Sequence, residues 1–203
     1  MLTIVIACCW NKDDIKILLF AKFGLRRWDN QKELSSAVYD VYLMYCNRDY
    51  LWSQQTLLNR LESNGFRVFD KNRDTVAGHT EQQLETALSL SRRVVVVLSG
   101  NFLIDDAIIK EFYRADTHAK ERGQSRYIII VKLASENNSF FFRHLEKYRI
   151  FGRYLRTNYY ADTSRRNFWR RLFYWLPTPT SPNRQDVECV GEGQRVDIRP
   201  LIN

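Results

Sequence analysis

Residues 73–78 combine the side-chain types that a recognition loop uses. Arg73 and Asp74 place opposite charges next to each other, and Val76 offers an apolar contact beside them. The glycine that ends this stretch can adopt a positive φ. Arg73 and Asp74 are able either to contact a partner or to pair with each other and shape the loop, and the sequence leaves both alternatives open. Binding is the chemistry that this set supports, and its members are Arg73, Asp74, Thr75, Val76, Ala77 and Gly78.

The residue types that carry nucleophilic or metal chemistry lack the spacing that such chemistry needs. The four cysteines form no C-x-x-C pair, and the three histidines have no companions at the spacing of a zinc site or a catalytic triad. The segment N-R-D at 47–49 provides one carboxylate and no glycine, which argues against a phosphoacceptor or a flavin site. We therefore predict no metal, no resident cofactor and a reduced, intracellular setting.

The loop is expected to lie between a strand and a helix. The stretch F-R-V-F at 66–69 is apolar and favours a strand, and Gly65 is suited to ending the preceding helix. Thr80 and Gln83 have the spacing of a capping box, which predicts a helix beginning at Thr80. A polar loop held between two regular elements is a common place for function.

Strands and helices alternate along the rest of the chain. Further strands are predicted at 38–45, 93–98 and 127–133, a short edge strand at 153–155, and a last helix at 165–176. The strands are apolar on both faces, as in a parallel sheet that helices cover. The predicted fold is α/β, a flavodoxin-like doubly wound parallel sheet of about five strands with flanking helices. Residues 73–79, which include this loop, then lie at the carboxyl edge of the sheet.

The composition restricts the class of protein and of partner. The 203 residues carry a net charge of +8 and are 45% apolar, which excludes a wholly disordered chain. A basic balance suits acidic proteins, nucleic acid or an anionic membrane surface. Nucleic acid has only the net charge in its favour, so no nucleic-acid partner is predicted. The arginines at 165–171 are expected to form a solvated face, with a patch for an acidic partner or a membrane as the alternative.

The two ends of the chain differ from its middle. The apolar run M-L-T-I-V-I-A-C-C-W is far shorter than the about 20 residues that cross a bilayer. We interpret residues 1–14 as the end of a truncated transmembrane span, with a short hydrophobic segment packed on the domain as the alternative. Residues 15–37 are predicted to be a basic juxtamembrane segment and linker, 38–176 a folded domain, and 177–203 a disordered tail rich in proline, glycine and charge.

Four motifs, in order, resemble those of the Toll/interleukin-1 receptor (TIR) domain over residues 39–176. Y-D-V-Y-L-M-Y at 39–45 is similar to the family's first box, and R-D-T-V-A-G at 73–78 to its second, R-D-x-x-P-G. Phe168 and Trp169 match the Phe-Trp pair of the third box, and L-S-G-N-F at 98–102 is similar to the family's L-S-x-x-F turn. The segment 19–26 also resembles the juxtamembrane part of invertebrate Toll-type receptors.

The resemblance implies a signalling module of a Toll-like innate immune receptor. Such a module self-associates and recruits TIR-containing adaptors by TIR–TIR assembly, on the cytoplasmic side of a membrane, as part of a single-pass receptor. Val76 and Ala77 are then the expected partner contacts. Ala77 replaces the family's proline, which would hold φ near about −65°, so this loop is expected to be more mobile and its contacts weaker. The structural residues implied by the boxes are Tyr39, Asp40, Tyr45, Phe168 and Trp169.

The resemblance also implies an alternative in which the chain is an enzyme. Some members of the family cleave NAD at the nicotinamide–ribose bond with a glutamate of the third helix. Glu111 is at the matching position, and its carboxylate would either stabilise an oxocarbenium-like transition state directly or hydrogen-bond the ribose hydroxyls to the same end. Lys110 beside it suggests an ordinary helix surface. Assembly without catalysis is therefore the main prediction, with NAD+ nucleosidase activity as the alternative.

Overall fold

The computed structural model describes residues 37–75, 80–123, 126–134, 138–156 and 160–179. They contain a five-stranded sheet, and every pair of neighbouring strands in it is parallel. The strand order is β2-β1-β3-β4-β5. The strands are β1 (Tyr39–Met44), β2 (Val68–Asp70), β3 (Ser91–Leu98), β4 (Ile128–Lys132) and β5 (Tyr160–Asp162). The predicted doubly wound parallel sheet is thus confirmed.

The central strand follows directly from its sequence. All eight residues of β3 are buried, because β1 and β4 pair with its two edges and helices cover both of its faces. A run of valines satisfies this position, since β-branched side chains pack well on a pleated surface. The chain leaves β1 toward β2 on one side and later crosses to β3 on the other. The carboxyl end of β1 is therefore the point where a doubly wound sheet opens a crevice.

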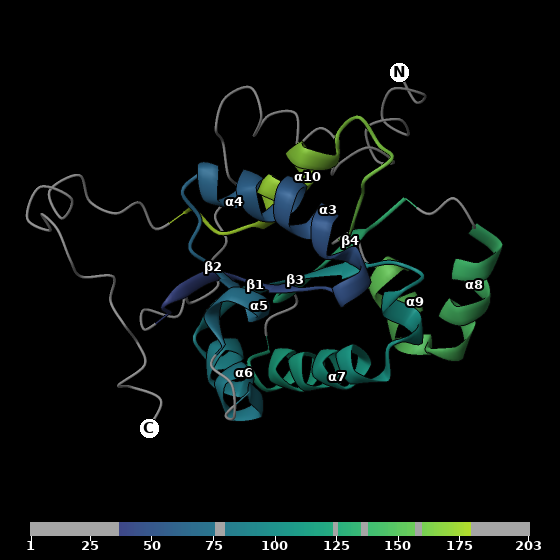
Figure 1. Ribbon diagram of the computed structural model, residues 1–203, viewed down its shortest axis with the longest axis horizontal. Helices are drawn as coiled ribbons and strands as arrows, with labels where there is room; N and C mark the ends of the chain where they lie inside the picture. Colours follow the sequence, from purple (N-terminus) through teal and green to yellow (C-terminus); the bar gives the residue numbers. More distant parts are fainter. Residues whose placement is uncertain (1–36, 76–79, 124–125, 135–137, 157–159, 180–203) are drawn as a thin grey trace, which may run out of the picture.

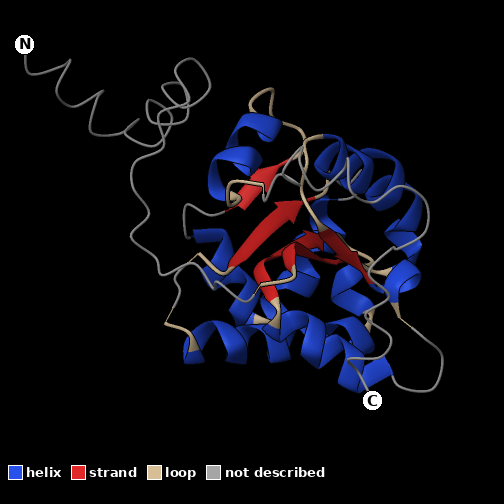
Figure 2. Ribbon diagram, turned by 90° about the vertical axis from the view of Figure 1, so that its left-hand side faces the viewer, coloured by secondary structure: helices blue, strands red, loops and turns tan. Residues whose placement is uncertain are grey.

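Helices form a layer on each face of the sheet (Figure 1). One layer holds η1 (Asn47–Asp49), α3 (Tyr50–Trp52), η2 (Ser53–Leu58), α4 (Asn59–Ser63) and α10 (Phe168–Trp175). The other holds α6 (Thr80–Ser89), α7 (Asp106–Glu121) and α9 (Arg149–Arg156), with α8 (Asn138–Lys147) joined to α9. Two short helices, α5 (Lys71–Asp74) and η3 (Phe102–Ile104), follow the carboxyl ends of β2 and β3. In Figure 2 the strands lie between helices on both sides.

The sheet separates two hydrophobic cores. Tyr42 and Met44 of β1 are in the core shared with α6, α7 and α9. Val41 and Leu43 are in the core shared with α4 and α10. This alternation is the period of two that a β-strand imposes on its side chains.

The predicted edge strand at 153–155 is wrong, because these residues lie within α9. The physical reason is the spacing of the apolar side chains Ile150, Phe151, Tyr154 and Leu155, which pack on one core as one side of a helix does. The edge strand is β5 instead, and its Ala161 is paired with Val131 of β4.

The boundaries of other predicted segments shift by a few residues. The last helix begins at Phe168 rather than at 165. Residues 177–179, predicted to start the tail, lie against the amino edge of the sheet, where the Thr178 carbonyl accepts a hydrogen bond from Arg92. The predicted span (1–14), residues 15–36 of the basic segment and residues 180–203 lie outside the described residues. Within the described part of the chain, no helix has both the length and the apolar character that crossing a membrane requires.

Candidate functional site

The stem of the predicted recognition loop is built at the carboxyl ends of β1 and β2. The Tyr45 hydroxyl donates a hydrogen bond of 2.7 Å to the Asp70 carboxylate, and Gln54 Nε2 donates to the other oxygen of the same carboxylate at 2.7 Å. Asn72 Nδ2 of α5 donates to the Tyr45 hydroxyl at 2.9 Å. Burial, and then the hydrogen bond to Asp70, raise the pKa of Tyr45 above its ordinary value of 10.0. The phenol therefore stays a neutral donor and ties α5 to β1.

Arg73 and Asp74 bond to each other and to the base of the loop. Arg73 Nε and Nη2 donate to the two Asp74 carboxylate oxygens at 2.8 Å and 3.0 Å. Arg73 also donates to the Glu62 carboxylate at 2.6 Å and to the Val68 carbonyl at 2.7 Å. Asp74 in turn accepts the backbone N–H of Asp70 at 2.8 Å, which satisfies a donor at the start of α5. The geometry is that of a pair that shapes the loop.

Lys71 and Glu111 join the loop stem to α7. The Lys71 ammonium lies 3.2 Å from one carboxylate oxygen of Glu111, and the Tyr42 hydroxyl donates to the other at 2.7 Å. Only 6% of the Glu111 side chain is exposed, against 39% for Lys71. Burial, followed by the charge and hydrogen bond of Glu111, holds the pKa of Tyr42 well above its ordinary value. Both carboxylate oxygens of Glu111 thus have donors.

The expectation that Glu111 lies on an ordinary helix surface is therefore wrong. Lys110 is exposed, but Glu111 is one residue further round α7, beside the buried Ile108 and Phe112. Neighbouring helical residues differ in direction by roughly 100°, so the exposure of one does not predict that of the next.

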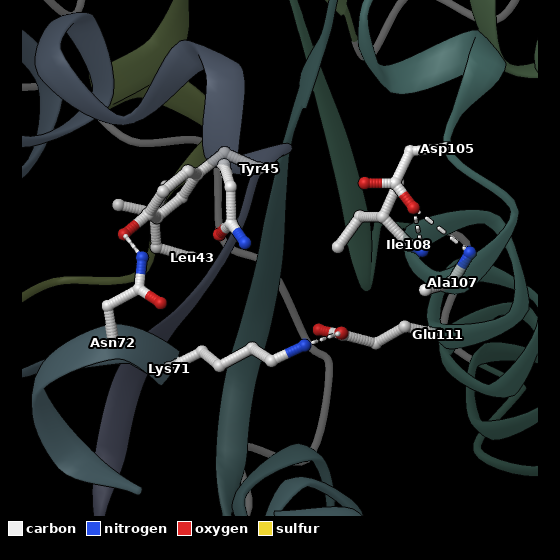
Figure 3. A pocket seen from close by; sticks show the side chains of 9 residues that line it. Leu43, Tyr45, Lys71, Asn72, Asp105, Ala107, Ile108 and Glu111 are labelled. Carbon is white, nitrogen blue, oxygen red and sulfur yellow. Dashed lines mark hydrogen bonds and ion pairs between the residues drawn. The ribbon is translucent and has the colours of Figure 1, made fainter.

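A small pocket opens beside this ion pair, between α5 and α7 (Figure 3). Its volume is about 70 Å³, which accommodates a few water molecules. Asp105 forms one wall and caps α7 by accepting the N–H groups of Ala107 and Ile108 at 3.0 Å and 3.4 Å. The lining residues are Leu43, Tyr45, Asn47, Lys71, Asn72, Asp105, Ala107, Ile108 and Glu111.

The structure brings some of the predicted residues together and leaves others apart. Arg73, Asp74, Thr75 and Tyr45 all belong to the loop stem, where the Thr75 hydroxyl donates to the Lys71 carbonyl at 2.6 Å. Glu111 reaches the stem through Lys71. Three further predicted loop residues, Val76, Ala77 and Gly78, lie outside the described residues, as does His79 beside them.

The remaining box residues lie at other places. Asp40 is buried at the amino end of β1, where it accepts the backbone N–H of Arg67 at 3.0 Å and Arg92 Nη1 at 2.9 Å. The Tyr39 ring packs edge-on against Phe69.

Phe168 and Trp169 are part of the opposite helical layer, where Phe168 is buried. Their rings are 4.7 Å apart, and the Arg60 guanidinium of α4 lies over the Trp169 ring. These contacts anchor α10 to the sheet and to α4.

Sequence reasoning missed the residues that hold the stem from outside the loop. Gln54, Glu62 and Lys71 are polar residues on helices, and such residues are most often solvated. Asp105 had a local signal, because an aspartate directly before a helical apolar pattern is typical of an N-cap. Within the described ranges, no group of three or more His, Cys, Asp or Glu residues could hold a metal ion.

The comparisons with known proteins agree with this architecture. The model of the TIR domain family matches residues 41–167. Toll-like receptor 7 of Drosophila melanogaster is 31% identical over 181 residues, which is 87% of this chain and 12% of that protein. Protein toll of the same organism is 27% identical over 184 residues, or 89% of this chain and 16% of that protein. The chain thus spans less than a fifth of the length of these relatives.

A solved structure shows the same fold. The metazoan TIR-STING receptor from C. gigas superposes with a TM-score of 0.52 at 20% identity, covering 71% of this chain and 41% of that one. At this identity the likeness concerns the fold alone. The family match covers more than half of the chain and includes the strand, loop and helix that build the site. The chain therefore belongs to the TIR domain family, and its TIR domain is related to those of Toll receptors.

Proposed function

We propose that this chain is the cytoplasmic signalling module of a Toll-like receptor and recruits TIR-containing adaptors by TIR–TIR assembly. The observation that carries the proposal is the fixed stem of loop 73–78. Tyr45, Asp70 and Asn72 hold α5 against the sheet, and Lys71 bonds to Glu111 of α7. A loop that leaves a rigid stem loses less conformational freedom when it binds, which favours its use as a contact surface.

The hydrogen bonds between Arg73 and Asp74 suggest different roles for different loop residues. Because Arg73 and Asp74 satisfy each other, we assign them the role of shaping the loop. Contact with the adaptor, and with a second copy of the chain, then falls to Val76, Ala77 and Gly78. Without the family's proline, Ala77 leaves this part of the loop freer, which raises the entropic cost of binding. We expect the resulting affinity for adaptors to be lower than that of a proline-containing loop.

We also propose that the domain works beside a membrane. Residues 1–14, which begin with an apolar run of ten residues, and the basic segment 15–37 fit the end of a span followed by a cytoplasmic juxtamembrane segment. The similarity to two Toll receptors over most of this chain supports the same placement.

Substitution of Val76 by aspartate tests the adaptor contact. We expect Val76→Asp to abolish capture of a purified TIR-containing adaptor, because it introduces a charge at an apolar contact, and to leave the melting temperature nearly unchanged. Leu51→Asp is the matched control, since Leu51 is 67% exposed on α3 and outside the loop. A large loss of stability in Val76→Asp, or equal loss of capture in both variants, would contradict the assignment.

Cleavage of NAD by Glu111 is the second candidate, and one observation favours it. Glu111 lines the pocket at the carboxyl edge of the sheet. The Glu111 carboxylate is, however, occupied by Lys71 and Tyr42, and the volume of about 70 Å³ is far below the roughly 300 Å³ at which ligand pockets usually begin. We expect no NAD consumption by the purified, artificially clustered protein. Turnover that disappears in Glu111→Ala would make this chain an enzyme.

A further inference from the structure

The positive charge of this protein is concentrated in one part of the chain. Residues 138–171 contain nine arginines and lysines against two acidic residues, a net charge of +7 out of +8 for the whole chain. These residues form α8, α9, β5 and the start of α10. Figure 1 shows α8 and α9 together at one end of the molecule, beyond β4 and away from β2.

Several acidic residues elsewhere in the domain pair with basic side chains, whereas most of the arginines of α8 and α9 have no carboxylate partner among the described residues. Glu62 pairs with Arg73, Glu81 with Arg114, and Glu111 with Lys71. In contrast, no carboxylate among the described residues pairs with Arg143, Arg149 or Arg156. Arg153 is 3.2 Å from Asp116, yet 58% of its side chain is still exposed. The excess charge therefore faces solvent.

The helical spacing gathers these charges on the outer sides of α8 and α9. Phe151 is fully buried, with its ring 4.5 Å from that of Phe112, which fixes the inner side of α9. Arg149, Arg153 and Arg156 follow one another at intervals of four and three residues, so they form a single outer stripe. In α8, Arg143 and Lys147 have the same spacing, and Phe142 beside them is 53% exposed.

We propose that the outer sides of α8 and α9 bind an anionic lipid surface, with Arg149, Arg153 and Arg156 as the main contacts. The inference rests on the proposed placement beside a membrane. Arginines spread over two helices suit a laterally extended charged surface, whose lipids diffuse to meet them. A folded acidic protein would instead have to match their fixed positions. An exposed aromatic ring among basic residues is typical of groups at the lipid headgroup level. Tethering to the same membrane raises the effective concentration of this surface, so weak contacts suffice.

Charge reversal tests the proposal in the full chain. The probes are vesicles of three parts phosphatidylcholine to one part phosphatidylserine, and vesicles of phosphatidylcholine alone, which measure binding by the apolar N-terminal residues. Each basic residue near an anionic leaflet strengthens binding about fivefold. Because R149E/R156E removes two such residues, we expect it to weaken the phosphatidylserine-dependent affinity for the vesicles at least about 25-fold. R48E/K110E is the matched control, because it changes the net charge equally at exposed residues of η1 and α7. We expect it to weaken binding less than about fivefold, as charges beyond a Debye length are screened.

Several results would overturn the proposal. Equal weakening of vesicle binding in both double variants would show that only the net charge matters. Unchanged vesicle binding by R149E/R156E would show that the arginine stripe of α9 does not contact the lipid. Tighter binding of the wild-type chain to polyglutamate or duplex RNA than to the anionic vesicles would indicate that the partner of this surface is an acidic protein or a nucleic acid and not a lipid. Melting curves of both variants establish that they fold. Adaptor capture by R149E/R156E separates the two proposals, because loss of vesicle binding with intact capture leaves the proposed function standing.

Discussion

The two edges of the sheet carry the same kinds of charged side chain and use them differently. Beside β2, the Arg73 guanidinium donates to Asp74, to Glu62 and to the Val68 carbonyl. Beyond β4 and β5, the outer stripe of α9 holds arginines of which Arg149 and Arg156 have no carboxylate partner among the described residues. At the first edge, hydrogen bonds to specific partners fix the orientation of each charged side chain. At the second edge, the arginines mainly contribute a positive electrostatic potential at the surface.

This difference separates two kinds of contribution to function. Hydrogen-bonded charges hold backbone in place, and removing one leaves its partner unsatisfied. Unpaired surface charges add little to folding, but they attract an oppositely charged partner over about 10 Å at moderate salt. Substitutions at the β2 edge should therefore change stability and loop geometry together. Substitutions on the outer side of α9 should change binding alone.

The largest expected effect comes from the buried side of α9. Phe151→Ala removes a fully buried ring that lies 5.7 Å from Phe102 and 4.5 Å from Phe112. We expect the free energy of unfolding to fall by about 3–5 kcal/mol, measured by urea denaturation. Phe142→Ala is the control and should change stability little, because half of that ring is already exposed. Similar losses in both variants would contradict the division of this region into an inner and an outer side.

The next largest effect on stability is expected at the loop stem, from the ion pair between Lys71 and Glu111. Glu111→Gln leaves the Lys71 ammonium without its charged partner and is expected to cost about 1–3 kcal/mol, as is Lys71→Met. In a double-mutant cycle the two changes should be coupled by at least about 0.5 kcal/mol. Lys110→Met, at the exposed neighbouring position, is the control and should have almost no effect. Additive losses would mean that the ion pair does not tie α5 to α7.

The buried phenol of the stem is expected to make the stability of the domain depend on pH. The pKa of Tyr45 in the folded protein is raised above 10.0, chiefly by burial, whereas the unfolded chain ionises near about 10. Stability from Tyr45 is therefore fully present below pH about 10 and is lost as the pH rises above it. Tyr45→Phe should cost about 1 kcal/mol at neutral pH, with the difference from the wild type shrinking above pH about 10.

Urea denaturation at neutral pH and at two alkaline values measures this effect. Tyr113→Phe is the matched control, because Tyr113 is 44% exposed on α7. At neutral pH the Tyr113 variant should be about as stable as the wild type. A Tyr45→Phe variant that also runs parallel to the wild type at alkaline pH would show that the phenol is not held in its neutral form.

The smallest effect is expected on the outer stripe of α9. Arg149→Ala and Arg156→Ala should each change the free energy of unfolding by less than about 0.5 kcal/mol, because neither guanidinium has a carboxylate partner among the described residues. Thermal denaturation at low and high salt measures this directly. A clear loss in either variant would place that arginine among the structural charges and remove the contrast between the two edges.

Local patterns predicted the sheet well and one segment badly. The valine run of β3 indicated a strand, because a short, β-branched apolar stretch favours a buried strand over a buried helix. Residues 153–155 were misassigned because three residues carry no measurable period, and the helix becomes evident only over the whole of Arg149–Arg156. In the same way, the exposure of Lys110 gave no information about Glu111.

The sequence by itself determined the alternation of the main strands and helices as far as β4, the four motifs of the family and the concentration of positive charge in residues 138–171. These follow from propensity, periodicity and composition, which act between residues close in the chain. The tertiary structure alone decided that Glu111 meets Lys71, 40 residues away, and Tyr42, 69 residues away. It also decided that Arg73 pairs with Asp74 and Glu62, whereas Arg149 and Arg156 of α9 are exposed and have no carboxylate partner among the described residues. The physical reason is that ion pairs and burial depend on which elements pack together, and no local pattern encodes that.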